Sequence, residues 1–241
     1  MNSQPHKDLA QPLFRGFRNA QDMFTVLADE ITGRLAASAA RGASMVISGG
    51  TTPGDLYDVL AERSFYWNRV EITLSDERWC DTSSDRSNEK LARSRLLVDR
   101  ATKAELVPLK TALAHAREAE AEVNAAIAAM PRPFDVVLLG MGTDGHTASL
   151  IPGSDGLARA MDASDPALVR AVHPPDLTNM GERMTLTLRA LLGSRAIFLL
   201  IRGDAKLEAY KHALSGRDIL EAPVRAVLHQ NSVPVSVFWS E

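Results

Sequence analysis

"LLGMGTDGHTASL", residues 138–150, joins the end of an apolar run to a glycine-rich loop. The whole run, Phe134–Gly140, is typical of a strand in a parallel sheet, because both faces of such a strand are covered. Gly140, Gly142 and Gly145 have the G-x-G-x-x-G spacing of a dinucleotide-binding loop. A buried strand that ends in such a loop predicts an α/β fold and draws attention to the carboxyl end of the sheet.

Other short apolar runs outside this stretch are also continuous rather than alternating, and each predicts a buried strand. They are Ser44–Ser48, Val70–Ser75, Ala196–Ile201, Arg225–Leu228 and Val235–Trp239. Amphipathic stretches lie between some of them and predict helices over Gln21–Ala40, Asn88–Val98 and Ala112–Ala129. This alternation predicts an α/β fold with a Rossmann-like open, mostly parallel sheet and helices on both faces.

The chain has 241 residues and neither an internal repeat nor a linker that would divide it. We therefore expect a single domain over residues 1–241. The stretch Pro152–Pro175 is rich in Pro, Asp, Ser and Gly, which predicts a long surface excursion.

Composition excludes several classes of function. The net charge of −3 provides no basic field for nucleic acid or an anionic membrane. The single cysteine, Cys80, allows no disulfide within the chain, and the six histidines lack the spacing of a zinc site, so we expect no metal. The first residues have no apolar leader, and no apolar run approaches the roughly 20 residues that cross a bilayer. We expect a soluble cytoplasmic protein.

The glycine-rich loop has the spacing of a cofactor site but not its chemistry. Asp144 would repel a pyrophosphate, no long helix clearly starts at Gly145, and no acidic residue stands at the usual distance further along. Asp144 and His146 are better suited to acid–base work. The carboxylate can orient the imidazole, which can move a proton near neutral pH. The alternative is that both residues only cap the loop.

A second glycine-rich stretch, "SGGTTPGDLYDVL" (48–60), predicts a phosphate-binding turn. Gly49 and Gly50 allow backbone N–H groups close to a ligand, Thr51 adds a hydroxyl, and the following helix start favours negative charge. The stretch is not a Walker A loop, because no lysine follows the glycines. The alternative is an ordinary turn capped by Thr52.

Charged residues in three other places could complete a site. Asp76, Glu77 and Arg78 follow a predicted strand and could orient a polar substrate, although most such triplets lie in solvated loops. Arg183 and Lys206 could supply the positive charge that the glycine turn lacks; alternatively, each is a surface charge. Cys80 is better explained as a small apolar residue than as a nucleophile.

Together these stretches resemble the 6-phosphogluconolactonase family, which is related to the glucosamine-6-phosphate deaminases. The resemblance spans residues 48–206 and rests on five motifs in the family's order. They are "SGGTTP" (48–53), "SDER" (75–78) with "SN" (87–88) and "LL" (96–97), "FDVVLLGMGTDGHTASLIPGS" (134–154), "RMTLTL" (183–188) and "GDAK" (203–206).

The resemblance implies a cofactor-independent hydrolase of the oxidative pentose phosphate pathway, which opens 6-phospho-D-glucono-1,5-lactone. It implies that a cluster of glycine, threonine and basic residues holds the substrate phosphate: Gly49, Gly50, Thr51, Arg183 and Lys206. It also implies catalytic roles for His146 as the acid–base residue, Asp144 beside it, and Asp76 and Arg78 facing the sugar. We expect a small-molecule lactone as the partner and a monomer or weak homodimer.

Two positions separate this chain from its possible relatives. Trp79-Cys80 stands where the family commonly has Val-Pro, which predicts a different local loop shape. Ile151 stands where the deaminases have a glutamate five residues after the histidine, and an isoleucine cannot relay protons. Lactone hydrolysis is therefore favoured over three alternatives: a deaminase–isomerase, a non-catalytic sugar-phosphate sensor and a nucleotide-dependent oxidoreductase.

Overall fold

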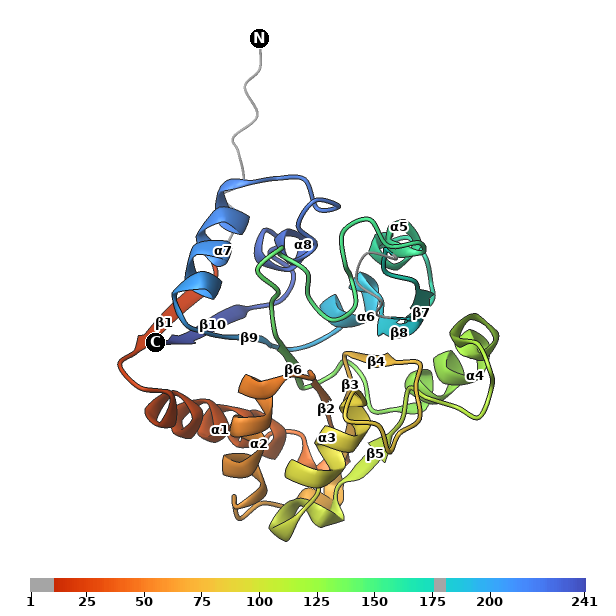
Figure 1. Ribbon diagram of the computed structural model, residues 1–241. Coiled ribbons are helices and arrows are strands. Elements are labelled where there is room, and N and C mark those ends of the chain that lie inside the picture. The colour runs from red at the N-terminus through yellow and green to blue at the C-terminus, as the bar shows by residue number, and fades with distance from the viewer. Residues whose placement is uncertain (1–10, 176–180) are drawn as a thin grey trace, which may run out of the picture.

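The computed structural model describes residues 11–175 and 181–241, so most of the N-terminal stretch considered above lies outside it. A seven-stranded sheet runs through the centre of the molecule (Figure 1), and all its pairings are parallel. Its order is β1 (Leu13–Phe17), β10 (Val235–Ser240), β9 (Ile197–Arg202), β6 (Val136–Leu139), β2 (Ala43–Ile47), β3 (Val70–Leu74) and β5 (Glu105–Val107).

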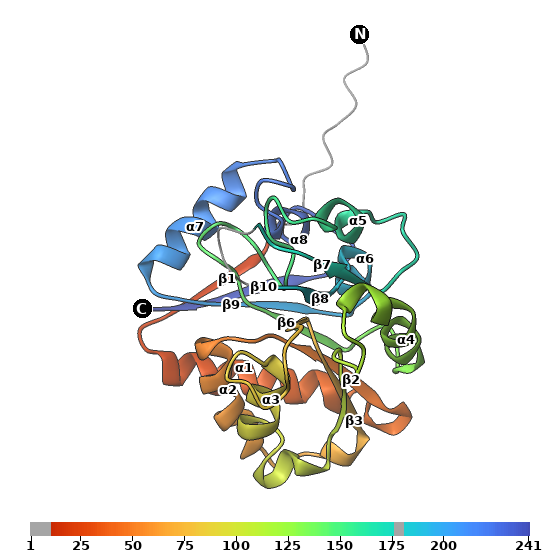
Figure 2. The ribbon, with the colours of Figure 1, turned by 45° about the vertical axis from the view of Figure 1, so that its right-hand side comes forward.

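Helices cover both faces of this sheet, as Figure 2 shows. Three lie against one face: α1 (Ala20–Ala36), α2 (Thr51–Ala61) and α3 (Asn88–Arg95). The opposite side carries α5 (Leu157–Met161), α6 (Leu188–Leu192), α7 (Asp204–Ser215) and α8 (Val224–Leu228), while α4 (Ala116–Ala129) packs beside a smaller sheet. The predicted fold class is confirmed.

The central strands explain why the apolar runs are continuous. β2 and β6 are buried at every residue, because each has a strand on both sides and helices on both faces. Short 3-10 turns at Ala39–Arg41, Trp67–Arg69 and Asp99–Lys103 connect elements at the periphery. None of the described helices is long and apolar enough to cross a membrane.

A second, three-stranded antiparallel sheet lies above the main one and was not predicted. Its order is β4 (Asp76–Arg78), β8 (Arg183–Leu186) and β7 (Val169–Val172). β7 and α5 fall within Pro152–Pro175, so the prediction of a surface excursion there is wrong: Leu157, Met161 and Val169 belong to the core. Turn-forming residues mark the connections, but the apolar residues between them pack inward.

The predicted strand over Arg225–Leu228 is also wrong, since these residues belong to α8. Pro223 precedes that helix with a helical φ of −57°, which favours a helical start. A run of four residues is too short for its period to distinguish strand from helix. Elsewhere the predicted helices exist but are shorter, with α1 ending at Ala36, α3 at Arg95 and α4 beginning at Ala116.

The strand order places a crevice in the middle of the main sheet. From β2 the chain moves outward through β3 and β5, whereas from β6 it moves the other way through β9 and β10. Connections on either side of such a switch point leave in opposite directions, so the loops at the strand ends separate there. The loops after β2 and β6 are those that carry the two glycine-rich stretches.

Candidate active site

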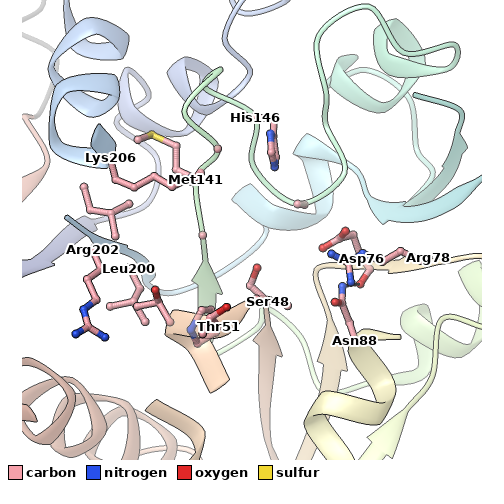
Figure 3. Close-up of a pocket in the computed structure, with 18 of the residues that line it drawn as sticks. Ser48, Thr51, Asp76, Arg78, Asn88, Met141, His146, Leu200, Arg202 and Lys206 are labelled. Carbon is pink, nitrogen blue, oxygen red and sulfur yellow. Dashed lines mark hydrogen bonds between the residues drawn. The ribbon is translucent and has the colours of Figure 1, made fainter. Parts of the chain in front are cut away.

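A cleft of about 360 Å³ lies at the carboxyl end of the sheet, over this switch point. It is lined by residues of the loops after β2, β3, β6 and β9, together with Arg183 from the small sheet. All the predicted site residues except Asp144 line it. Figure 3 shows His146 pointing into the cleft, with Asp76 and Arg78 on one side and Lys206 on the other.

Asp144 lies behind the histidine and holds it. The distance from Asp144 Oδ1 to His146 Nδ1 is 2.6 Å, and the same oxygen accepts the backbone N–H of His146 at 3.2 Å. The hydrogen bond with the imidazole lowers the pKa of Asp144 to about 2, although partial burial opposes this. An ionised carboxylate can only accept, so Nδ1 carries the proton and Nε2 of a neutral ring keeps its lone pair.

The glycines of this loop make room for the pair. A Cβ on Gly142 would lie 2.2 Å from both Asp144 Oδ1 and His146 Nδ1. The N–H of Gly142 also donates to the carbonyl of His146 at 2.8 Å, which closes the turn. Gly145 has a φ of +79°, where a side chain is strained. No helix follows β6 until α5, so the rejection of a dinucleotide loop agrees with the local structure.

The turn after β2 is shaped to receive an anion. Gly50 is the N-cap of α2, with a φ of +112° that favours glycine, and Thr51 begins the helix. The first N–H groups of a helix have no acceptor within it, and the helix dipole adds positive potential there. Gly49 packs against Asn88 so closely that a Cβ would lie 1.9 Å from Asn88 Oδ1. The predicted cap, Thr52, is therefore replaced by Gly50.

Lys206 lies in the first turns of α7, as predicted, and reaches across to the loop after β6. Its Nζ donates to the carbonyl of Met141 at 2.7 Å. Partial burial lowers the pKa of Lys206, while the nearby Asp144 carboxylate acts in the opposite direction. This contact ties the helix after β9 to the loop that carries His146.

Asp76 and Arg183 form a buried charged pair on the opposite wall. Arg183 Nη1 lies 3.8 Å from Asp76 Oδ2, and the hydroxyl of Ser149 lies between them. Burial lowers the pKa of Arg183, and the Asp76 carboxylate counteracts this. Arg78 pairs with Arg183 across β4 and β8, so two guanidinium groups come from adjacent strands. The arginine side chain of Arg78 also donates to the carbonyl of Arg86.

Glu77 differs from its expected role beside the substrate. It is fully buried and accepts the N–H groups of Asn88 at 2.8 Å and Glu89 at 2.7 Å, at the start of α3. It also accepts the Ser87 hydroxyl at 3.0 Å. Burial raises the pKa of Glu77, against these hydrogen bonds, which lower it. Its function in the fold is to cap α3, and the serine-asparagine pair ten residues further on is the sequence signal that could have shown this.

Trp79 and Cys80 lie outside the cleft lining. Trp79 Nε1 donates to the carbonyl of Ala114 at 2.9 Å, and the ammonium of Lys110 lies 4.2 Å from the indole ring centre. Cys80 is partly exposed, so the expectation of a buried apolar cysteine is only approximate. The departure from Val-Pro thus attaches the segment 110–114 to the end of β4.

Sequence reasoning gave no individual role to several residues of the site. Asn88 and Arg202 line the cleft, and Ser149 lies fully buried in its wall. Asn88 Nδ2 donates to the carbonyl of Asp76 at 2.8 Å, and Arg202 Nη1 lies 3.6 Å from Asp55 Oδ2. The described residues include no group of His, Cys, Asp or Glu side chains placed to hold a metal ion. Ile151 is buried and does not line the cleft among the described residues.

The chain was compared with known proteins. Residues 18–239 match the family model of glucosamine-6-phosphate isomerases/6-phosphogluconolactonase. A 6-phosphogluconolactonase of Rhizobium meliloti is 40% identical over 93% of this chain and 97% of its own length. One of Caulobacter vibrioides is 39% identical, over 93% and 96%. The crystal structure of a 6-phosphogluconolactonase from Shewanella baltica superimposes with a TM-score of 0.93 at 40% identity, covering 97% of this chain and 99% of that one.

Proposed function

The chain belongs to the glucosamine-6-phosphate isomerase/6-phosphogluconolactonase family, and from this premise we propose how its cleft performs the reaction. The protein hydrolyses 6-phospho-D-glucono-1,5-lactone to 6-phospho-D-gluconate, the second step of the oxidative pentose phosphate pathway. The observation that carries the mechanism is the pair of Asp144 and His146, which faces a cleft with basic residues and a helix start in its walls.

Lactone hydrolysis needs an activated water, a stabilised oxyanion and a proton for the departing ring oxygen. His146 removes a proton from the water as that water attacks C1, and later returns it to the ring oxygen. The contact of Nδ1 with the ionised Asp144 supports Nε2 as the atom that takes the proton. Asp144 orients the ring and stabilises its charged form.

The negative charge that develops on the carbonyl oxygen needs a donor. Arg78 or the backbone N–H groups of the loop after β6 meet this charge, while Asp76 orients the sugar. Arg78 and Asp76 both line the cleft on the side opposite Lys206, which supports this assignment (Figure 3).

The phosphate of the substrate binds to groups far from the reacting carbon. Gly49, Gly50 and Thr51 offer the N–H groups at the start of α2, and Arg183 and Lys206 add positive charge from opposite walls. Binding energy at this end positions C1 against His146, so its loss weakens turnover as well as affinity.

Replacing Lys206 by alanine should mainly raise KM, by roughly 10- to 100-fold, the usual loss for a hydrogen bond to a charged group. Initial rates over a range of lactone concentrations measure this change. Lys211→Ala is the matched control, since this lysine lies on the same helix, is exposed and pairs with Glu208. A Lys206→Ala variant with the KM of the Lys211→Ala variant would remove Lys206 from the phosphate site.

A side-by-side assay of two substrates tests the function itself. We expect hydrolysis of 6-phosphogluconolactone above its spontaneous rate and no ammonia from glucosamine 6-phosphate, because Ile151 replaces the proton-relaying glutamate of the deaminases. Ammonia release would establish the deaminase alternative. Binding of the lactone without turnover would establish a non-catalytic sensor.

The setting of the enzyme is part of the same proposal. A single domain over residues 1–241, a cytoplasmic location and a monomer or weak homodimer fit a chain with one cysteine and a net charge of −3. Its partner is then a small sugar-phosphate lactone rather than a nucleic acid or a membrane.

A further inference from the structure

We propose that Ser149 is a positioning residue that holds Arg183 in place for substrate binding. This inference rests on the proposed role of Arg183 at the phosphate. The observation behind it is a buried hydroxyl between a carboxylate and a guanidinium group, in the wall of the cleft. Ser149 is 0% exposed, and neither its sequence position nor its chemistry makes it a group that touches substrate.

The directions of the hydrogen bonds around Ser149 follow from its single proton. Its Oγ donates to Asp76 Oδ2 at 2.5 Å, since an ionised carboxylate can only accept. The same Oγ accepts from Arg183 Nη1 at 3.2 Å. The other oxygen of Asp76 accepts from the hydroxyl of Ser75 at 2.9 Å, so the carboxylate is held at both ends.

The serine sets the separation of the charged pair. The direct distance from Arg183 Nη1 to Asp76 Oδ2 is 3.8 Å, too long for a good hydrogen bond. Without the hydroxyl, both groups would lose a partner in a buried setting, and the guanidinium could satisfy itself by moving onto the carboxylate. That movement would draw Arg183 away from the cleft. Ser149 therefore keeps the cation where a substrate anion can reach it.

Ser149 also links this pair to the segment that carries His146. Its backbone N–H donates to Thr185 Oγ1 at 3.3 Å on β8, two residues after Arg183. The neighbouring Ala148 has a φ of 50°, which an alanine adopts only where its surroundings fix it. Thr147, whose hydroxyl donates to the carbonyl of Gly140 at 2.8 Å, and Ser149 provide those contacts on either side. The loop of the base and the wall of the cation are thus fixed by one buried hydroxyl.

The test is Ser149→Ala with the steady-state constants measured separately. We expect KM for the lactone, and the inhibition constant of 6-phosphogluconate, to rise about 10-fold, the loss typical of a hydrogen bond to a charged group. The kcat should change much less, because His146 and Asp144 keep their contact. Ser154→Ala is the matched control, since this buried hydroxyl lies five residues further on and has no hydrogen-bond partner within the described chain.

Three further variants separate positioning from a purely structural role. Ser149→Thr retains a hydroxyl and should retain the affinity even if it is less stable. In an Arg183→Lys background, Ser149→Ala should add little to KM, because the group it positions is already altered. A lower melting temperature with KM and the inhibition constant unchanged would overturn the proposal, as would additive effects of the two substitutions.

The outcome also distinguishes this inference from the proposed function. If Arg183→Lys raises KM and Ser149→Ala does not, only the role of Ser149 is wrong. If neither substitution changes KM or the inhibition constant, the assignment of Arg183 to the phosphate is wrong, and the role of Ser149 falls with it.

Discussion

Replacing His146 by alanine should reduce kcat by roughly 10²-fold or more, as the loss of a general base does, and should leave KM close to that of the wild type. The imidazole provides the only proton acceptor that we assign to the attacking water, whereas the groups assigned to the phosphate lie elsewhere in the cleft. The measurement is the rate of hydrolysis of freshly prepared lactone, after subtraction of the spontaneous reaction.

A control for this variant should test the loss of a histidine without loss of the site. His212→Ala serves, because His212 is exposed on the outer part of α7 and does not line the cleft. Both kinetic constants should remain at the wild-type values in that variant. If His146→Ala hydrolyses the lactone as fast as His212→Ala, His146 is not the base.

Gly142→Ala should reduce kcat almost as far, by roughly 10²-fold, although Gly142 donates no side chain to the reaction. The added methyl group would lie 2.2 Å from Asp144 Oδ1 and from His146 Nδ1, so the pair could not keep its contact. The loss should appear in kcat at saturating lactone, with the thermal unfolding temperature measured in parallel to separate it from a loss of folding.

Gly140→Ala is the matched control for this substitution. Its Cβ would meet Ser48 Oγ at 3.7 Å, which is ordinary contact, and the backbone there needs no left-handed conformation. We expect a far smaller loss of activity. Equal kcat values for the Gly142→Ala and Gly140→Ala variants would show that the contact between Asp144 and His146 does not limit the reaction.

The main sheet could be predicted because its central strands are covered on every side. Such strands contain almost only apolar residues, so β2, β6 and β9 are visible in the sequence. The small sheet could not be predicted in this way. Its strands have three or four residues, and β4 consists of Asp76, Glu77 and Arg78, whose charges are satisfied by partners distant in sequence.

The candidate site was predictable to the extent that its chemistry is local. Asp144 and His146 are two residues apart, and their contact follows from the loop that contains them. Ser149 meets Asp76 across 73 positions and Arg183 across 34, so only the assembled fold reveals that it joins them. Asn88 is a similar case, because its contact with Gly49 depends on how α3 packs beside the turn after β2.

The position of β10 in the main sheet has a consequence for the order in which the molecule is assembled. β10 fills the place between β9 and β1, with Leu13 opposite Ser236, so β1 has no neighbour in the sheet until almost the whole chain has been synthesised. Joining segments so distant along the chain is slow and entropically costly. A nascent chain can therefore form the half of the sheet around β2 and β3 early. The half that carries Lys206 waits for the ribosome to release its final strand.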